Sequence, residues 1–471
     1  MSGSASAGAQ PANGAVSFWY AGQGLPAPRP PLAGDADVDV AIIGAGYTGL
    51  WTAYYLKRAR PDLEITVLER RFAGYGASGR NGGWLTNTMT GGRDKYVLSH
   101  GRDLVARFQL LLNETVDEVI TVARAEGIDA DIAKGGELNV ALNPAQLRRL
   151  QAWAQAEEQW PESGARLLDA AGTAERVRIA GALGGLHQPH CARIQPAKLV
   201  RGLADAVEAL GVRICEQTPV TEIRPAAGGR PAAAVTPRGT VRARFVLRAT
   251  EGFTAGFRAT HRDWLPMNSS MIVTEPLSDA AWERIGWEHM DTVGDLAHAY
   301  MYAQRTADGR IALGGRGVPY RFGSRTDADG ATQPGTVRSL AALLRTMFPA
   351  AGGARIEHAW AGVLGVPRDW RASVGLDARS GMGWAGGYVG TGVAASNLAG
   401  RTLRDLVLGA DSELAAMPWV NRKVRRWEPE PLRWLGVHAM YRAYHAADRA
   451  ERDGRADTSP IARAADLVSG R

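Results

Sequence analysis

One glycine-rich motif restricts the fold of this chain more than any other part of the sequence. Residues 44–49 read Gly-Ala-Gly-Tyr-Thr-Gly, which fits the pattern G-x-G-x-x-G. An apolar run at residues 40–43 precedes the motif and helical periodicity follows it at residues 50–60, so we predict a buried strand, a tight turn and a helix. A second strand is predicted at residues 64–68, directly before Glu69. This order is typical of the first βαβ unit of a dinucleotide-binding domain.

The three glycines and the start of the helix have separate physical roles in this unit. Gly44 permits the tight turn, Gly46 lets a pyrophosphate approach the backbone, and Gly49 lets the helix pack closely against the strand. Tyr47 and Thr48 stand at the helix N-terminus, where free N–H groups and the positive end of the helix dipole attract phosphate. We therefore expect all five residues to contact the cofactor.

The acidic residue at the end of the second strand indicates which dinucleotide binds. Glu69 can accept hydrogen bonds from ribose hydroxyl groups, which favours NAD or FAD over NADP. Arg70 and Arg71 follow directly and weaken the exclusion of NADP, and we count Arg70 among the candidate cofactor contacts. A strand-to-helix turn without any ligand is the alternative, and the complete order of strand, glycines, helix, strand and acid argues against it.

A second glycine-rich loop starts shortly after the acid. Five glycines within residues 74–83 indicate a backbone that approaches another group closely. We expect phosphate contacts from Ser78 and Arg80, and contacts to a flat ring system from Asn81, Gly82 and Gly83. A flexible loop without a ligand is the alternative interpretation.

The rest of the chain repeats this organisation once and adds segments at both ends. A strand, a glycine-rich turn and a helix occur again at residues 382–406, and the helix N-terminus near Gly390 can present N–H groups to a partly negative atom. Residues 1–16 are predicted to be disordered, and residues 17–37 to form an ordered arm across the surface. The tail at residues 411–471 is predicted to be mostly helical.

Composition excludes several classes of function. The chain has 471 residues, which allows about three domains, and a net charge of +7. Its arginines are scattered, so we expect no nucleic-acid partner. The two cysteines, Cys191 and Cys215, are too few for a disulfide framework or a cysteine-based zinc site, and no metal site is predicted. No apolar stretch reaches membrane-spanning length, and a cytoplasmic location is expected.

Several motifs follow one another in the order found in a known protein family. They are the motif at residues 44–49 with Glu69, the loop Gly-Ala-Ser-Gly-Arg-Asn-Gly-Gly, Ile-Gln-Pro-Ala-Lys-Leu at residues 194–199, Arg-Ala-Thr at residues 248–250 and Gly-Tyr-Val-Gly-Thr-Gly at residues 387–392. Over residues 35–410 the chain resembles the D-amino-acid-oxidase-like (DAO) family of FAD-dependent oxidoreductases. Within that family it looks most like the branch that contains glycine and sarcosine oxidases and gamma-glutamylputrescine oxidoreductase.

The resemblance implies an α/β fold. A Rossmann-like FAD-binding domain of the GR2 type would be interleaved with an α+β substrate domain that contains a mixed sheet. The FAD-binding domain would comprise residues 35–95, 191–255 and 356–410, and the substrate domain residues 96–190 and 256–355. Residues 1–34 would form the disordered segment and the arm, and residues 411–471 a helical extension.

The resemblance also implies an activity. Members of this family oxidise the C–N bond of a small amine or amino acid: a hydride passes to flavin N5 and water hydrolyses the resulting imine, in an oxidative deamination or N-dealkylation. The implied partners are an amine or amino acid and oxygen or another electron acceptor. Three alternatives stay open, namely a flavin dehydrogenase of the same fold, an NAD-dependent dehydrogenase, and a non-catalytic flavoprotein.

Some cofactor contacts are assigned through the resemblance alone. Val220 would meet the adenine through its backbone, and Thr250 and Gly252 would form a second turn that faces the flavin. This turn more often reads Thr-Asn-Ala in the family, and Glu251 stands in the middle of it here. The pyrimidine side of the flavin would face Gly387, Gly390, Thr391 and Gly392.

Two departures from the family concern oxygen and the attachment of the flavin. Sarcosine-oxidase-like members use a lysine near the flavin to activate oxygen, but residues 199–422 of this chain contain no lysine. Arg316 is the candidate replacement for this lysine. The missing lysine favours a dehydrogenase over an oxidase. Cys191 and Cys215 precede the region of the covalent cysteine of sarcosine oxidases, so we expect non-covalent FAD.

The substrate side offers few candidates. Arg316, Trp84 and Tyr302 are the predicted catalytic residues, with Arg316 as the anchor of a substrate carboxylate or phosphonate and Arg305 as the second choice. Trp84, Trp360 and His358 are candidate walls of the pocket, although a histidine on a strand is more often structural.

Overall fold

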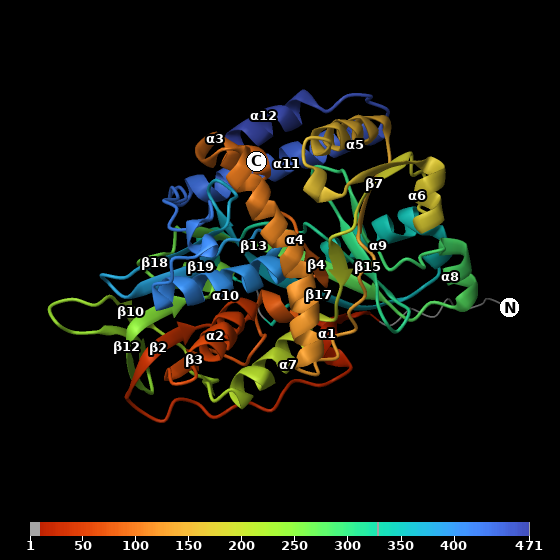
Figure 1. Cartoon of the computed structure of the whole chain (residues 1–471). Coiled ribbons are helices and arrows are strands. Elements are labelled where there is room, and N and C mark those ends of the chain that lie inside the picture. Colours follow the sequence, from red (N-terminus) through yellow and green to blue (C-terminus); the bar gives the residue numbers. More distant parts are fainter. Residues whose placement is uncertain (1–9, 327–328, 471) are drawn as a thin grey trace.

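The computed structural model describes residues 10–326 and 329–470, which form two large sheets with helices around them (Figure 1). The first sheet contains, in this order, β10 (Glu222–Arg224), β11 (Ala232–Thr236), β12 (Gly239–Arg248), β2 (Ala36–Ile43), β3 (Ile65–Leu68) and β9 (Arg213–Cys215). A further strand, β19 (Met382–Gly386), pairs with β12, and β18 (Ser373–Asp377) pairs with β19.

Parallel pairing in the first sheet brings several strand ends together. Ile43 at the end of β2 pairs with Leu68 of β3 and with Arg248 of β12, and Arg248 pairs in turn with Trp384 of β19. All four strands are parallel, so the loops that follow them leave the sheet at one edge. The loops predicted to bind the cofactor are these loops.

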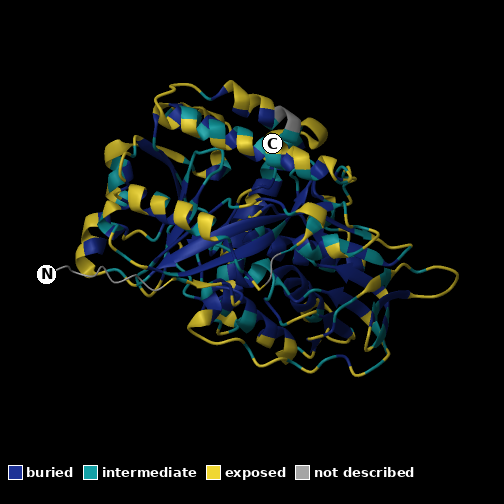
Figure 2. Ribbon diagram, turned by 180° about the vertical axis from the view of Figure 1, so that it is seen from behind, coloured by how far each residue is buried: buried dark blue, intermediate teal, exposed yellow. Residues whose placement is uncertain are grey.

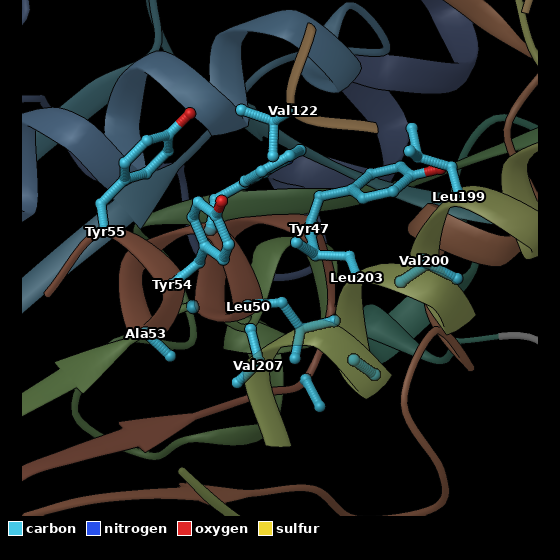
Figure 3. Close-up of a cluster of buried hydrophobic side chains, with 14 of the residues drawn as sticks. Tyr47, Leu50, Ala53, Tyr54, Tyr55, Val122, Leu199, Val200, Leu203 and Val207 are labelled. Atoms are coloured by element: carbon cyan, nitrogen blue, oxygen red, sulfur yellow. The ribbon is translucent and has the colours of Figure 1, made fainter. Parts of the chain in front are cut away.

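Four helices cover the first sheet: α2 (Tyr47–Ala59), α4 (Arg102–Ala125), α7 (Pro196–Ala209) and α10 (Gly392–Leu408). Their apolar side chains form one buried cluster with the sheet, and Figure 3 shows Leu50 of α2 beside Leu203 and Val207 of α7. The predicted strand–turn–helix order at residues 40–60 is thereby confirmed, with the helix beginning at Tyr47. Helix α2 begins directly after Gly46, so its N-terminus points at the edge where the loops meet.

The second sheet is mixed and lies beside the first (Figure 1). Its strands are, in order, β1 (Ala12–Asn13), β17 (Ile356–Pro367), β13 (Trp264–Thr274), β16 (Ile311–Gly315), β15 (Tyr302–Arg305), β14 (Thr292–Asp295), β5 (Glu137–Ala141), β7 (Gly184–Gln188) and β6 (Arg166–Asp169). The remaining helices of this half are α5 (Pro144–Glu157), α6 (Ala170–Arg176), α8 (Asp279–Ile285) and α9 (Pro334–Met347). Helix α3 (Arg93–His100) packs against α4, and β4 (Trp84–Thr86) and β8 (Cys191–Arg193) form a small sheet of their own.

The predicted fold class is confirmed. The domain boundaries stay a prediction, and two elements pack across them. Residues 356–367, assigned to the FAD-binding domain, form β17, which pairs along its length with β13 in the second sheet. Helix α4, assigned to the substrate domain, buries Val116 and Val119 in the same cluster as Tyr54 and Tyr55 of α2. Apolar periodicity predicts both elements but not which neighbour covers them, since that choice depends on tertiary packing.

The N-terminal arm is more deeply buried than predicted. Residues 10–16, expected to be disordered, are ordered, because β1 pairs with β17, and residues 1–9 lie outside the described part. Helix α1 (Phe18–Ala21) follows, and its Trp19 and Tyr20 are buried rather than spread on the surface. Trp19 Nε1 donates a hydrogen bond to the carbonyl oxygen of Asn81 at 2.8 Å, and its ring lies 5.7 Å from that of Trp360. The arm therefore supports the second glycine-rich loop.

The C-terminal extension, defined here as α11 (Leu432–Arg452) and α12 (Pro460–Ser469), is helical as predicted and lies next to α5 (Figure 1). Glu451 forms an ion pair with Arg149 of α5 at 2.7 Å and contacts His298 at 2.9 Å. Asp448 accepts hydrogen bonds from the backbone N–H groups of His298 and Ala299 at 2.8 and 3.1 Å. The extension thus fixes the loop between β14 and β15.

Burial follows the layers of the fold. Figure 2 shows buried strands in the centre and exposed residues on the outer faces of the surrounding helices. Within residues 10–326 and 329–470, no helix combines the length and the apolarity needed to span a membrane.

Removing the Trp19 side chain tests the role of the arm. We expect Trp19→Ala to lower the free energy of unfolding by about 3–5 kcal/mol, because a buried indole and its hydrogen bond are lost. Thermal unfolding followed by circular dichroism measures the change. Leu98→Ala is the matched control, since this leucine is 90% exposed and its loss should leave the midpoint unchanged. Equal midpoints for both variants would contradict this role.

Candidate active site

The first glycine-rich loop is as tight as its sequence predicts. Gly44 has a φ of +104°, and a Cβ atom there would lie 2.6 Å from the carbonyl oxygen of Ala249. A Cβ atom at Gly46 would lie 2.9 Å from Ser78 Oγ, and one at Gly49 would collide with the carbonyl oxygen of Gly44. The first turn of α2 contains no acidic residue, so its positive end is available to an anion.

Glu69 holds this loop in place. Its carboxylate accepts hydrogen bonds at 2.9 Å from the N–H groups of Ala45 and Arg71, and burial raises its pKa. Each carboxylate oxygen has a second acceptor position, which suits ribose hydroxyl groups. Arg70 is exposed beside it, and Val220 is partly buried in the segment before β10 rather than on a strand, because β10 begins at Glu222. Their contacts to the cofactor stay predictions.

The second glycine-rich loop is fastened to the first. Ser78 Oγ accepts a hydrogen bond from the N–H group of Tyr47 at 2.8 Å, whereas the Tyr47 hydroxyl is directed away and donates to the carbonyl oxygen of Pro196. Asn81 accepts from the N–H group of Gly83 at 2.8 Å. The loop therefore contains an ordered 3-10 turn at residues 77–79, and residues 81–83 after it are also hydrogen-bonded. The alternative interpretation as a flexible loop is wrong.

Arg80 has contacts that sequence reasoning did not predict. Its Nε donates to the carbonyl oxygen of Tyr75 at 2.8 Å, and its Nη1 donates to that of Ala361 at 3.3 Å. The guanidinium lies 4.4 Å from the centre of the Tyr75 ring. Arg80 thus ties the loop to β17, and a phosphate contact stays a prediction.

The other two turns reach the same edge of the sheet. Thr250 lies beside Gly44, and Gly252 packs against β17, where a Cβ atom would lie 2.7 Å from Val363. Gly387 and Gly390 have φ angles of +78° and +110°, which glycine adopts readily. The N–H group of Gly387 donates to Glu251 at 2.7 Å, so this N–H group is directed away from the predicted flavin position.

A cavity of about 470 Å³ opens between these turns and the second sheet. Asn81 and Gly82 line it from the second glycine-rich loop, and Gly390 and Thr391 line it from the last turn. The second sheet and its loops contribute Glu137, Asn139, Ser269, Gly294, Asp295, Tyr300, Tyr302 and Arg316, and β4 contributes Trp84. Gly392 is the first residue of α10, and Thr48 is the second residue of α2. Neither residue lines the cavity.

Tyr302 and Trp84, two of the predicted catalytic residues, lie together in this cavity. Their rings stand edge to face with centres 6.2 Å apart. Tyr302 Oη is 2.8 Å from Ser269 Oγ, and its ring covers Gly314 and approaches Gly82, where a Cβ atom would lie 2.7 Å away. The two rings therefore form an aromatic wall, and its Tyr302 ring faces the second glycine-rich loop.

Arg316, the third predicted catalytic residue, is the cation of this cavity nearest to the aromatic wall. Its Nη2 donates to Tyr300 Oη at 3.2 Å, and neighbouring tyrosines raise its pKa although burial opposes this. Within the described part of the chain no carboxylate forms an ion pair with it, and its Nη1 is buried without a hydrogen-bond partner. A partly buried cation of this kind favours an anionic ligand.

Two buried acids in the cavity were missed. Glu137 accepts hydrogen bonds from Thr86 and Asn139, and burial raises its pKa. Burial likewise raises the pKa of Asp295 to about 7. An acid at residue 137 inside an otherwise apolar, alternating stretch was the available signal for Glu137, whereas no local sequence pattern indicates Asp295.

Three other candidates are not part of the cavity. Arg305 forms an ion pair with Glu288 and lies over the Trp282 ring, so it faces the opposite side of the sheet. Trp360 is buried against the arm, and its Nε1 donates to the carbonyl oxygen of Arg80. His358 Nε2 lies 2.9 Å from the carbonyl oxygen of Gly14. This contact agrees with the interpretation of His358 as a structural histidine.

Lysine and cysteine side chains also lie away from this cavity. Lys198 forms an ion pair with Asp131 at 2.7 Å. Cys191 and Cys215 are buried free thiols whose pKa values are raised by burial, and neither lines the cavity. No lysine lines it either, among the residues that the structure describes.

Comparisons with known proteins agree with this geometry. A family model described as FAD-dependent oxidoreductase matches residues 39–406. The chain is 31% identical over 397 residues to gamma-glutamylputrescine oxidoreductase of Escherichia coli, which covers 83% of this chain and 89% of the relative. It is 27% identical over 392 residues to a probable oxidoreductase OrdL of Haemophilus influenzae, covering 82% and 86% of the two chains.

Solved structures show the same fold. Glycine oxidase from Geobacillus kaustophilus aligns with a TM-score of 0.68 at 21% identity, covering 82% of this chain and all of the other. L-proline dehydrogenase from P. horikoshii aligns with a TM-score of 0.67 at 17% identity, covering 82% and 98%. The matched residues 39–406 end before the C-terminal extension.

Replacing Glu69 tests the nucleotide end of the site. We expect Glu69→Ala to weaken the binding of FAD about 10- to 100-fold, because an ionised acceptor and the support of the first loop are lost. Absorbance titration of the protein freed of flavin measures the dissociation constant. Glu64→Ala removes an exposed acid nearby and should leave it unchanged. Full flavin retention by Glu69→Ala would contradict the assignment.

Proposed function

Since the chain belongs to the family of FAD-dependent oxidoreductases, we propose that it oxidises the C–N bond of a small amino acid or N-substituted amino acid. The names of its relatives support this class of substrate, because they include a gamma-glutamylputrescine oxidoreductase and a glycine oxidase. An NAD-dependent dehydrogenase is set aside, because the family match names FAD.

The residues present fit FAD. The glycines of the first loop leave space that a Cβ atom would fill, Glu69 can take a ribose, and the N-terminus of α2 can take phosphate. FAD, once bound, would supply the acceptor for the hydride that leaves the substrate. We propose that it is held without a covalent bond, which is supported by the position of both cysteines away from the cavity.

Arg316 is the observation that carries the substrate proposal. A partly buried guanidinium that lines the cavity without a carboxylate partner in the described chain would bind the carboxylate of an amino acid. Tyr300 accepts a hydrogen bond from this guanidinium and would keep its direction fixed. The aromatic wall of Tyr302 and Trp84 would then orient the carbon–nitrogen bond of the bound substrate.

The buried acids suit the protonation that this chemistry needs. An amine must lose its proton before its C–H bond is oxidised, and Asp295, with a pKa of about 7, can take up a proton at neutral pH. Glu137 would hold the ammonium form of a substrate that enters the cavity. Both groups would act on binding and deprotonation rather than on the oxidised bond itself.

A dehydrogenase that passes electrons to an acceptor other than oxygen is the second candidate. It is supported by the absence of any lysine among the described residues that line the cavity. We also propose a cytoplasmic location, because both cysteines are free thiols, as is usual in a reducing compartment.

An anaerobic reduction screen tests the proposed activity. We expect glycine, N-methylglycine or proline to bleach the flavin absorbance, and matched amines without a carboxylate to do so far more slowly. Readmitting air then separates the two candidates, because an oxidase recovers its colour within seconds. If no amino acid or amine reduces the flavin, the proposed function is wrong.

Replacing Arg316 tests the carboxylate anchor. We expect Arg316→Gln to weaken the binding of the best amino acid by about 30-fold or more, because losing one partner of a buried charge pair costs about 2–5 kcal/mol. The limiting rate of reduction and the substrate dissociation constant are both measured by stopped flow. Arg338→Gln, on the exposed face of α9, is the control. Unchanged binding in Arg316→Gln would assign the carboxylate to another residue.

A further inference from the structure

We propose that Glu251 is a positioning residue that holds the turn at residues 387–390 and sets a negative charge behind it, which opposes the charge that the flavin takes up on reduction. The inference rests on the proposed function in one respect, namely that the flavin lies in the cavity lined by this turn. It concerns the position where the family more often has asparagine.

The carboxylate of Glu251 joins three separate segments through backbone N–H groups. One oxygen accepts from Gly387 at 2.7 Å, and the other accepts from Tyr388 and from Gly365 of β17, both at 3.2 Å. The turn after β12, the turn after β19 and the C-terminal end of β17 are thereby tied at one point. A neutral side chain offers fewer acceptor positions for this task.

The surrounding backbone leaves space for the carboxylate. A Cβ atom at Gly386 would lie 2.6 Å from Glu251 Oε2, and one at Gly365 would lie 3.0 Å from it. Glu251 itself has a φ of +42°, a conformation that is costly for a residue with a side chain and persists only when its surroundings enforce it. The backbone of the turn therefore accommodates the Glu251 carboxylate specifically. Glu251 is not an exposed side chain that another residue could replace without effect.

The charges that face Glu251 do not neutralise it through direct contact. Arg248 of β12 lies nearby, but its guanidinium stacks on the Trp264 ring at 4.7 Å and approaches Asp263 at 3.7 Å. The Tyr388 hydroxyl is the other titratable group on the side of the turn. Burial raises the pKa of Glu251 to about 7, so the ionised form is well populated at and above neutral pH.

The turn connects this charge to the cavity. Val389, Gly390 and Thr391 line the cavity, and the two residues before them donate their N–H groups backwards to Glu251. The N-terminus of α10 follows directly and offers a positive dipole end on the same side. A carboxylate behind the turn offsets part of that stabilisation, because charges interact strongly through a dry interior. A flavin bound beside this turn should therefore accept negative charge less readily than it would if residue 251 were uncharged.

Removal of the charge at constant size tests the inference. In the flavin-loaded protein at pH 8, we expect Glu251→Gln to bind sulfite about tenfold or more tightly and to raise the flavin midpoint potential, because both report on negative charge at the flavin. Glu251→Asn, which restores the residue more common in the family, should change both in the same direction. Glu222→Gln, an exposed acid on β10, is the control for net charge and should change neither.

Unchanged or weaker sulfite binding in Glu251→Gln with flavin retained would overturn the inference. Loss of flavin from both Glu251 variants, with the control intact, would overturn the claim that the charge of the carboxylate acts on the bound flavin, and would leave only its role in holding the turn. Neither result touches the proposed function, which fails only if the wild-type flavin is not reduced by any amino acid or amine.

Discussion

Parallel pairing of β2, β3, β12 and β19 is the constraint on which the whole site depends. Because Ile43, Leu68, Arg248 and Trp384 are neighbours across these strands, the four segments that follow them start within a few strand spacings of one another. Gly44, Glu69, Thr250 and Gly387 belong to these segments. Residues separated by more than 300 positions in the chain thus face one cofactor site, and a change in register would separate them all.

How much of this follows from the sequence depends on how local the cause is. The first βαβ unit was predictable, since glycines at fixed spacing can be read without knowing their neighbours. The place of β17 and α4 was not, because apolar periodicity shows that an element is buried but not against what. Trp360 shows the same limit, as it is buried against an arm that was expected to lie on the surface.

The site residues divide along the same line. Arg316, Trp84 and Tyr302 all line the cavity, and their catalytic roles stay predictions. Tyr302 lies on β15, where alternation brings one side chain in two to the same face. Arg305 lies on the opposite face for the same reason. Arg80 binds two carbonyl oxygens, a pairing that no sequence pattern predicts, and its expected phosphate contact stays a prediction. From the sequence, Glu251 was visible only as a departure from the family pattern. Its role could not be predicted, because its three N–H partners come from two distant segments.

The C-terminal extension separates two properties of the molecule. Its Asp448 and Glu451 fix the loop at residues 296–300, its Asp466 lines the cavity, and its Tyr441 belongs to the same buried cluster as Val389. These residues lie beyond the stretch that the family shares, while the nucleotide contacts lie within it. Substitutions in the C-terminal extension can therefore change which molecules the cavity accepts without altering the residues of the nucleotide site.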